Sequence, residues 1–150
     1  KTCLWLERSG TWEWTETEFR FNGKGDNAGI LLLMPDVGAD LFNGYEVSLT
    51  TNGRKVIITR HQQDFRPLTE VQINFNPKKW NVLRAKIEEK EIEIFLNDNS
   101  IYHFKRNDVT LKNGIIAFHT WKSDVAYRNI QINDNCQTLR PEFQSLPVIT

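Results

Sequence analysis

Short stretches in which apolar and polar residues alternate recur along most of the chain, and they constrain the fold more than any other feature. In Glu91–Leu96 every second residue is apolar, and Val125 and Tyr127 begin a second such stretch that ends at Ile132. This is the period of a β-strand with one buried face. No segment has the apolar spacing of an amphipathic helix. About ten short strands without crossover helices predict an all-β fold, and we expect an antiparallel β-sandwich rather than a barrel.

Turn signals between these stretches predict hairpins. Asn52-Gly53 is the strongest of them, and it joins the expected strands Tyr45–Thr50 and Lys55–Arg60. A second turn signal, Asn97–Asn99, follows the first alternating stretch described above. Ile30–Met34 is apolar throughout, which predicts a strand that is buried on both faces.

Three segments are less regular. Trp12 and Trp14 fall in one phase of the strand alternation, and Phe19 and Phe21 fall in the other. This change of phase predicts a β-bulge or turn at Thr15–Thr17. His61–Thr69 is polar and contains Pro67, so we expect a loop there. No useful periodicity follows Gln137. We therefore expect a single sandwich domain over residues 1–136 and an extended C-terminal tail over residues 137–150.

Length and charge exclude some classes of function. A chain of 150 residues fits one domain with its own core. Lys and Arg together number 19, as do Asp and Glu, so no overall field attracts nucleic acid or an anionic membrane. No apolar run approaches the ~20 residues of a membrane-spanning helix. The first ten residues lack the pattern of a signal peptide, so the chain is either a mature protein or a domain of a larger one.

Two cysteines, Cys3 and Cys136, lie near opposite ends of the chain. If the first and last strands of the sandwich are neighbours, these residues form a disulfide that closes almost the whole chain. In the chain-entropy description such a long loop stabilises the fold by at most about 4–5 kcal/mol. The alternative is a pair of unrelated buried thiols. We favour the disulfide, and with it an extracellular or periplasmic location.

Four segments together resemble a known group of sandwiches, and they occur in the same order and at similar spacing: Glu18–Leu32, Phe42–Leu49, Lys78–Asp98 and Gly114–Ile132. The group has the concanavalin A-like jelly-roll fold of lectins, glucanases and laminin G domains. It includes the 3-keto-disaccharide hydrolase domain family and the family 66 carbohydrate-binding modules, and the resemblance covers roughly Trp12 to Ile132. One departure is Met34-Pro35, because the two families commonly have an arginine at the end of this strand that points into the sugar site.

This resemblance implies a surface that binds sugar. Our first hypothesis is a non-catalytic carbohydrate-binding module that recognises a glycan, for example a fructan, and that works beside other domains of a larger secreted glycosidase. The second is a glycoside hydrolase of the 3-keto-disaccharide hydrolase type. The third is an adhesion or protein-interaction domain of the laminin G kind, because the same fold serves all three functions.

Sugar recognition needs an aromatic ring face and polar groups that hold the hydroxyls. The connection before Val125 offers both, in Trp121 and Asp124, with His119 just before them. We expect nearby loops to add further polar side chains, so that the full set of predicted ligand-binding residues is Glu16, Asp36, Asn43, Arg60, His119, Trp121 and Asp124. The alternative is that Trp121 covers the core and that the charged residues are solvated surface groups.

The sequence predicts no catalytic residues. A glycosidase needs two carboxylates on facing elements, and no pair here has a diagnostic spacing. The three histidines are too far apart in sequence to indicate a transition-metal site. We expect no required cofactor. A structural calcium ion is the metal that such a sandwich most readily holds, with Asp26, Asp36, Asp40 and Asp134 as candidate ligands.

Overall fold

A computed structural model of the chain describes most of its strands. The described residues are 2–6, 10–11, 14–23, 27–34, 37–38, 41–62, 65–88, 90–105, 113–121, 124–132, 135–137 and 143–147. These residues form fifteen β-strands, and no helix occurs among them. The all-β fold that the sequence predicts is therefore confirmed.

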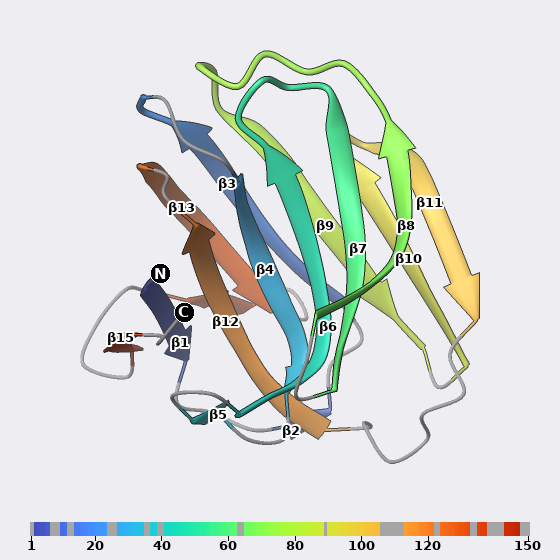
Figure 1. Ribbon diagram of the computed structural model, residues 1–150, viewed down its shortest axis with the longest axis vertical. Helices are drawn as coiled ribbons and strands as arrows, with labels where there is room; N and C mark the ends of the chain where they lie inside the picture. Colours follow the sequence, from blue (N-terminus) through green and yellow to red (C-terminus); the bar gives the residue numbers. More distant parts are fainter. Residues whose placement is uncertain are drawn as a thin grey trace.

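The strands form two antiparallel sheets (Figure 1). The first sheet has the strand order β15-β1-β12-β4-β6-β7-β8, and two short strands, β2 and β5, pair with β12 and β6. Its strands are β1 (Thr2–Leu6), β2 (Gly10–Thr11), β4 (Asn27–Met34), β5 (Val37–Gly38), β6 (Leu41–Thr50), β7 (Lys55–Gln62), β8 (Phe65–Gln72), β12 (Asn113–Trp121) and β15 (Phe143–Pro147).

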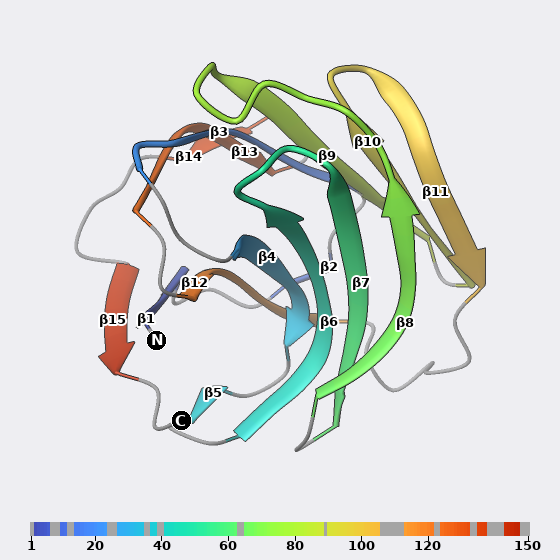
Figure 2. The same ribbon diagram turned by 45° about the horizontal axis from the view of Figure 1, so that its top comes forward.

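The second sheet has the order β11-β10-β9-β3-β13-β14. Its strands are β3 (Trp14–Phe21), β9 (Asn81–Ile87), β10 (Glu91–Leu96), β11 (Asn99–Lys105), β13 (Val125–Ile132) and β14 (Asn135–Gln137). Figure 2 shows β4, β6 and β7 on one side of the molecule and β3, β9 and β10 on the other. The two sheets therefore pack as the layers of a sandwich.

Alternate residues of both sheets point into one apolar core. Tyr45, Val47 and Leu49 of β6 are buried there, because every second residue of a strand faces the same side. The rings of Phe118 from the first sheet and Tyr127 from the second lie 4.7 Å apart between the layers. The other buried apolar residues are Phe19, Phe21, Val56, Ile58, Leu83, Ala85, Ile87, Ile92, Ile94, Leu96, Ile130 and Ile132.

Both predicted hairpin turns are confirmed. Gly53 has a φ of 73°, and a side chain there would come within 2.1 Å of the carbonyl oxygen of Phe75. Only glycine fits this position. Asn97 and Asp98 have φ values of 50° and 67°, as a two-residue turn between β10 and β11 requires.

The predicted irregularity at Thr15–Thr17 is wrong, because β3 alternates regularly over its whole length. Thr15 and Thr17 are buried on the same side as Phe19. Their hydroxyls donate hydrogen bonds of 3.2 Å to the backbone carbonyls of Gln131 and Arg128, which makes burial of these polar residues tolerable. The register break lies on the partner strand β13 instead, between Arg128 and Gln131.

The predicted loop at His61–Thr69 is also wrong, because β7 extends to Gln62 and β8 begins at Phe65. Pro67 is accommodated because β8 is the last strand of the sheet, where an edge needs no hydrogen bond on its outer side. The register with β7 shifts next to it, between Ile58 and Thr59.

The C-terminal segment contributes to the first sheet. Phe143–Pro147 forms β15, which pairs with β1 so that Leu146 lies opposite Cys3. Part of the segment expected to be a tail is therefore an edge strand. Its sequence is too short and too weakly patterned to predict this pairing.

Candidate functional site

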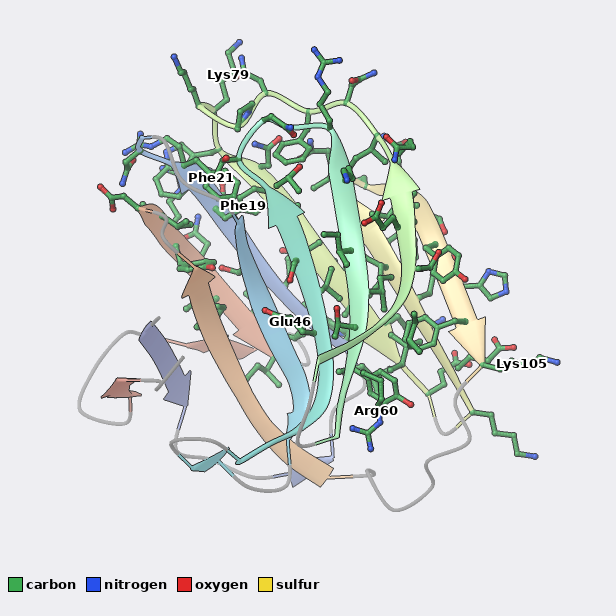
Figure 3. The ribbon with its side chains drawn as sticks, in the orientation of Figure 1. Phe19, Phe21, Glu46, Arg60, Lys79 and Lys105 are labelled. Carbon is green, nitrogen blue, oxygen red and sulfur yellow. The ribbon has the colours of Figure 1, made fainter. Side chains whose placement is uncertain are left out.

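The first sheet carries buried polar side chains on the side that faces away from the core, called here its outer face. Because Tyr45, Val47 and Leu49 face the core, Glu46 and Ser48 point to the outer face. They are nevertheless only 2% and 3% exposed. Figure 3 shows Glu46 midway along β6.

A glycine on the neighbouring strand makes room for the Glu46 carboxylate. Gly29 of β4 is paired with Ser48. A side chain at Gly29 would come within 2.5 Å of the carbonyl oxygen of Val47 and 3.0 Å of Oε2 of Glu46. The carboxylate therefore lies over the bare backbone of β4, where only glycine leaves enough space.

Thr59 completes this group from the other side. It lies on β7 directly opposite Glu46, it is fully buried, and its hydroxyl has no hydrogen-bond partner in the part of the chain that the structure describes. A buried hydroxyl without a partner is destabilising, typically by about 1–3 kcal/mol. We call Gly29, Glu46, Ser48 and Thr59 the outer-face polar cluster.

Two of the sequence-predicted site residues lie on β12, two strands away from β6. His119 is paired with Gly29, which is in turn paired with Ser48, so the three positions form one line across the sheet. Trp121 is the last residue of β12 and is paired with Asn27. The side chains of His119 and Trp121 lie outside the described residues.

Arg60 lies toward the opposite end of the first sheet. It is paired with Tyr45, its guanidinium lies 5.2 Å from the centre of the Tyr45 ring, and its Nη1 donates a 3.2 Å hydrogen bond to the carbonyl of Gly44. Trp121, at the end of β12, is instead in line with Thr50 of β6, because both residues are paired with Asn27 of β4. Five residue steps of β6 separate Tyr45 from Thr50, so the register does not bring Arg60 and Trp121 together.

The remaining predicted residues are dispersed. Asn43 is paired with Gln62 near Arg60, and its side chain lies outside the described residues, as does all of Asp36. Glu16 lies on the second sheet, opposite Arg84 and on the side away from the core. Asp124 is exposed just before β13, where its carbonyl accepts a 2.9 Å hydrogen bond from the amide of Asn22. The described members of the predicted set are thus divided between the two sheets.

The outer face of the second sheet is charged and aromatic. The guanidinium of Arg84 lies 4.4 Å from the centre of the Trp14 ring. Hydrogen bonds from Asn129, followed by the hydrogen bond and charge of Arg128, hold the pKa of Glu18 below its ordinary value of 4.5, although partial burial opposes them. A depression on this face is lined by Lys86, Glu88, Glu91, Glu93 and His103. Lys86 pairs with Glu88, and Ser100 donates to Glu93, so three of these five residues already have partners.

Metal and disulfide predictions fall mainly on residues that are not described. Among the described residues no group of three or more His, Cys, Asp or Glu is placed to hold a metal ion, and all four candidate calcium ligands lie outside them. Cys3 is on β1 of the first sheet and Cys136 on β14 of the second. Their side chains are not described, so the disulfide stays a prediction, and it would join the two sheets. The described residues also include no helix long and apolar enough to cross a membrane.

The architecture is that of a lectin-like jelly-roll sandwich. The chain belongs to the family of 3-keto-alpha-glucoside-1,2-lyase-like domains, whose model matches residues 11–133. This confirms the resemblance seen in the sequence. No curated protein matches the chain.

Solved structures agree on the fold. The carbohydrate-binding module CBM66 from Bacillus subtilis is similar with a TM-score of 0.71 and 15% identity, over 82% of this chain and 75% of that one. Sheep galectin-11, solved in complex with glycerol, gives a TM-score of 0.62 and 13% identity over 83% and 94% of the two chains. A second Bacillus subtilis protein, described as having a galectin-like fold, gives 0.71 and 10% over 91% and 78%.

Glu46 is absent from the site residues that the sequence predicts. The available signal is a carboxylate between Tyr45 and Val47 in a strand whose neighbouring residues are apolar. Alternation alone assigns such a residue to an exposed face. Its burial depends on neighbours from other strands, which the sequence pattern does not contain.

Proposed function

We propose that this protein binds a carbohydrate on the outer face of its first sheet, with Glu46 as the carboxylate that accepts hydrogen bonds from sugar hydroxyls. The observation that carries this proposal is the buried position of Glu46 over Gly29, on the side of the sheet away from the core. Removing a carboxylate from water costs several kcal/mol before its partners offset the loss. An apolar residue there would avoid that cost, so a carboxylate at this position indicates a role in a site.

The neighbouring residues suit this ligand. Sugar hydroxyls both donate and accept hydrogen bonds, and Ser48 and Thr59 supply hydroxyls beside the carboxylate. His119 shares the register line of Gly29 and Ser48. Trp121, near the end of the same sheet, remains our candidate for the aromatic ring that stacks on the sugar. The carbohydrate-binding module among the structural neighbours supports a glycan as the ligand.

Three further parts of the proposal concern the class of glycan, the location of the protein and the need for a metal ion. We infer a neutral glycan, with fructans as the first to be tested, because the sequence resembles the family 66 carbohydrate-binding modules. We place the domain in an extracellular or periplasmic glycosidase, where a Cys3–Cys136 disulfide is stable. Binding in this mechanism needs no metal ion, since charge-assisted hydrogen bonds and stacking hold the sugar.

A binding screen tests the proposal. The purified chain is run in native gels that contain levan, inulin or another neutral polysaccharide, and retardation is compared with a gel that contains none. We expect the wild type to be retarded and Glu46→Gln to bind at least about tenfold more weakly, since it keeps the shape but loses the charge.

Glu91→Gln is the matched control, because it makes the same change on the second sheet at a residue outside the predicted ligand-binding set. We expect it to bind like the wild type. Circular dichroism and thermal unfolding show whether each variant is folded. A folded Glu46→Gln variant with undiminished binding would overturn the assignment of Glu46.

A second candidate function follows from the family. A 3-keto-alpha-glucoside 1,2-lyase acts by removing the proton at C2, which is acidic because of the C3 ketone. The electron pair then forms the C1=C2 bond as the C1–O bond breaks, and the leaving group takes a proton. Glu46 is the residue of this chain that we assign as the base, because it is a carboxylate held out of bulk water.

An assay of product release distinguishes the binding module from the lyase. A 3-keto-alpha-glucoside is incubated with the wild type and with Glu46→Gln, and the released product is measured by chromatography. Release by the wild type that is lost in Glu46→Gln would establish the lyase. Glycan retention without any release supports the binding module.

A further inference from the structure

Trp80 supports two arginine side chains on the outer face of the second sheet. The guanidinium carbon of Arg128 lies 3.9 Å from the centre of a Trp80 ring, and that of Arg20 lies 4.7 Å from it. The arginines come from β13 and β3, which are paired strands. Stacking on an indole ring holds a planar guanidinium in position without using its N–H donors.

Both arginines keep donors available. Arg20 donates from Nε to Oδ1 of Asn22 at 3.2 Å, and Arg128 donates from Nη2 to Oε1 of Glu18 at 3.1 Å. A guanidinium has five N–H donors, so each retains several for a ligand. Glu18 accepts a hydrogen bond from Asn129 at its other oxygen, Oε2, so Arg128 engages this carboxylate through Oε1 alone.

Two lysines in the turn before β9 extend the positive surface. Lys78 and Lys79 are exposed and directly precede Trp80. Buried Asn81 fixes this turn, because its Nδ2 donates hydrogen bonds of 2.8 Å to the carbonyls of Asn76 and Lys79. Figure 3 shows Lys79 at the end of the molecule opposite Arg60. We call Arg20, Lys78, Lys79, Trp80 and Arg128 the Trp80 platform.

The platform concentrates positive charge in a chain without net charge. It carries four cations, and among the described residues the ion pair recorded for them is the one between Arg128 and Glu18. The side chains come from two strands and a turn, so they spread over an open surface. Such a surface suits an extended polyanion better than a small anion.

We propose that the Trp80 platform binds an acidic polysaccharide through its carboxylate or sulfate groups. Guanidinium groups match these anions in geometry and form two parallel hydrogen bonds with them. A protein partner fits less well, since protein interfaces rely on buried apolar anchors. Leu68, on the first sheet, is the large apolar residue that stands exposed among the described residues. The proposal does not depend on the site around Glu46, because the core separates the two outer faces.

Native gel electrophoresis tests this proposal with the full chain. The gels contain polygalacturonate, dextran sulfate or neutral dextran, and the salt concentration is varied. We expect retardation by the two anionic polymers and not by dextran, with binding that weakens as salt increases. The double variant Arg20→Gln/Arg128→Gln is expected to bind about tenfold more weakly at low salt.

Lys90→Gln/Lys105→Gln is the matched control, because it removes the same charge at exposed positions elsewhere on the second sheet. We expect this variant to bind within about twofold of the wild type, since its cations lie outside the platform. Glu46→Gln is expected to bind the anionic polymers like the wild type, which separates this proposal from the first.

Three outcomes would overturn the proposal. The first is wild-type retardation that is no greater in anionic gels than in dextran. The second is an equal loss of binding in both double variants, which would indicate a general charge effect. The third is equally strong binding of poly-glutamate, which would indicate an acidic protein partner. Thermal unfolding of each variant verifies that the fold is retained.

Discussion

At the scale of single residues, the polar groups that are buried matter more than those that are exposed. Glu46 and Thr59 lie opposite each other on β6 and β7, with less than 3% of either residue exposed. Thr15 and Thr17 are also buried, but their hydroxyls have carbonyl partners on β13. The hydroxyl of Thr59 has none among the described residues. The two hydroxyls on β3 therefore serve the fold, whereas we assign the Thr59 hydroxyl to the proposed site.

Glu18 provides a pH-dependent test at the same scale. Hydrogen bonds from Asn129 and the charge of Arg128 lower its pKa, so the ionised carboxylate stabilises the folded state. This contribution is fully present above the ordinary pKa of 4.5 and is lost as the pH falls through the folded-state pKa. Glu18→Gln should therefore lower the free energy of unfolding at pH 7 by at most about 1 kcal/mol, because the pair is at the surface.

Urea unfolding of the wild type and Glu18→Gln at neutral and acidic pH measures the effect. The difference between the two proteins should shrink as the pH falls below 4.5 and through the lower folded-state pKa, because the carboxylate then becomes protonated. A difference that is unchanged at acidic pH would show that Glu18 acts through packing and not through its charge.

At the scale of strands and turns, the sequence predicts what depends on local pattern. The Asn52-Gly53 hairpin and the alternating strand Glu91–Leu96 are present as expected. Three-dimensional context decides the rest. The register break that the phases of the aromatic residues predict on β3 lies on β13, and Pro67 is accepted because β8 is an edge strand. Neither fact is contained in the residues of the segment concerned.

The turn before β9 gives a prediction at this scale. Asn81 is 4% exposed, and its side chain binds the carbonyls of Asn76 and Lys79 and accepts a 3.0 Å hydrogen bond from Asn97. Asn81→Ala leaves these groups without partners and should lower the free energy of unfolding by about 2–3 kcal/mol. Chemical denaturation measures the change. The exposed Asn74→Ala is the control, and an equal loss in both variants would contradict the role given to Asn81.

At the scale of the whole molecule, the sandwich separates residues that the sequence analysis assigns to one sugar-binding site. Glu16 and Trp121 belong to different sheets. Arg60 is paired with Tyr45 of β6, which lies five residues along that strand from Thr50, the β6 residue in line with Trp121. The chemistry needed for sugar binding could be read from residue types. Its location could not, because which strands are neighbours is decided by sheet order and not by distance along the chain.

The two cysteines test how the sheets are joined. Cys3 and Cys136 lie on strands of different sheets, so the predicted disulfide would be a covalent link between the layers. A thiol-reactive label applied under denaturing, non-reducing conditions should find no free thiol. Reduction should then destabilise the fold by up to about 4–5 kcal/mol in the chain-entropy description. Two labelled thiols before reduction would eliminate the link.

The central claim is that the outer face of the first sheet binds a neutral glycan, and backbone amide shifts measure it most directly. Nuclear magnetic resonance spectra are recorded on labelled protein as a neutral glycan from the gel screen is added. The account predicts the largest shifts at Gly29, Ser48 and Thr59, while the amides of Glu16 and Arg20 on the second sheet stay unchanged. Shifts confined to the second sheet would contradict it.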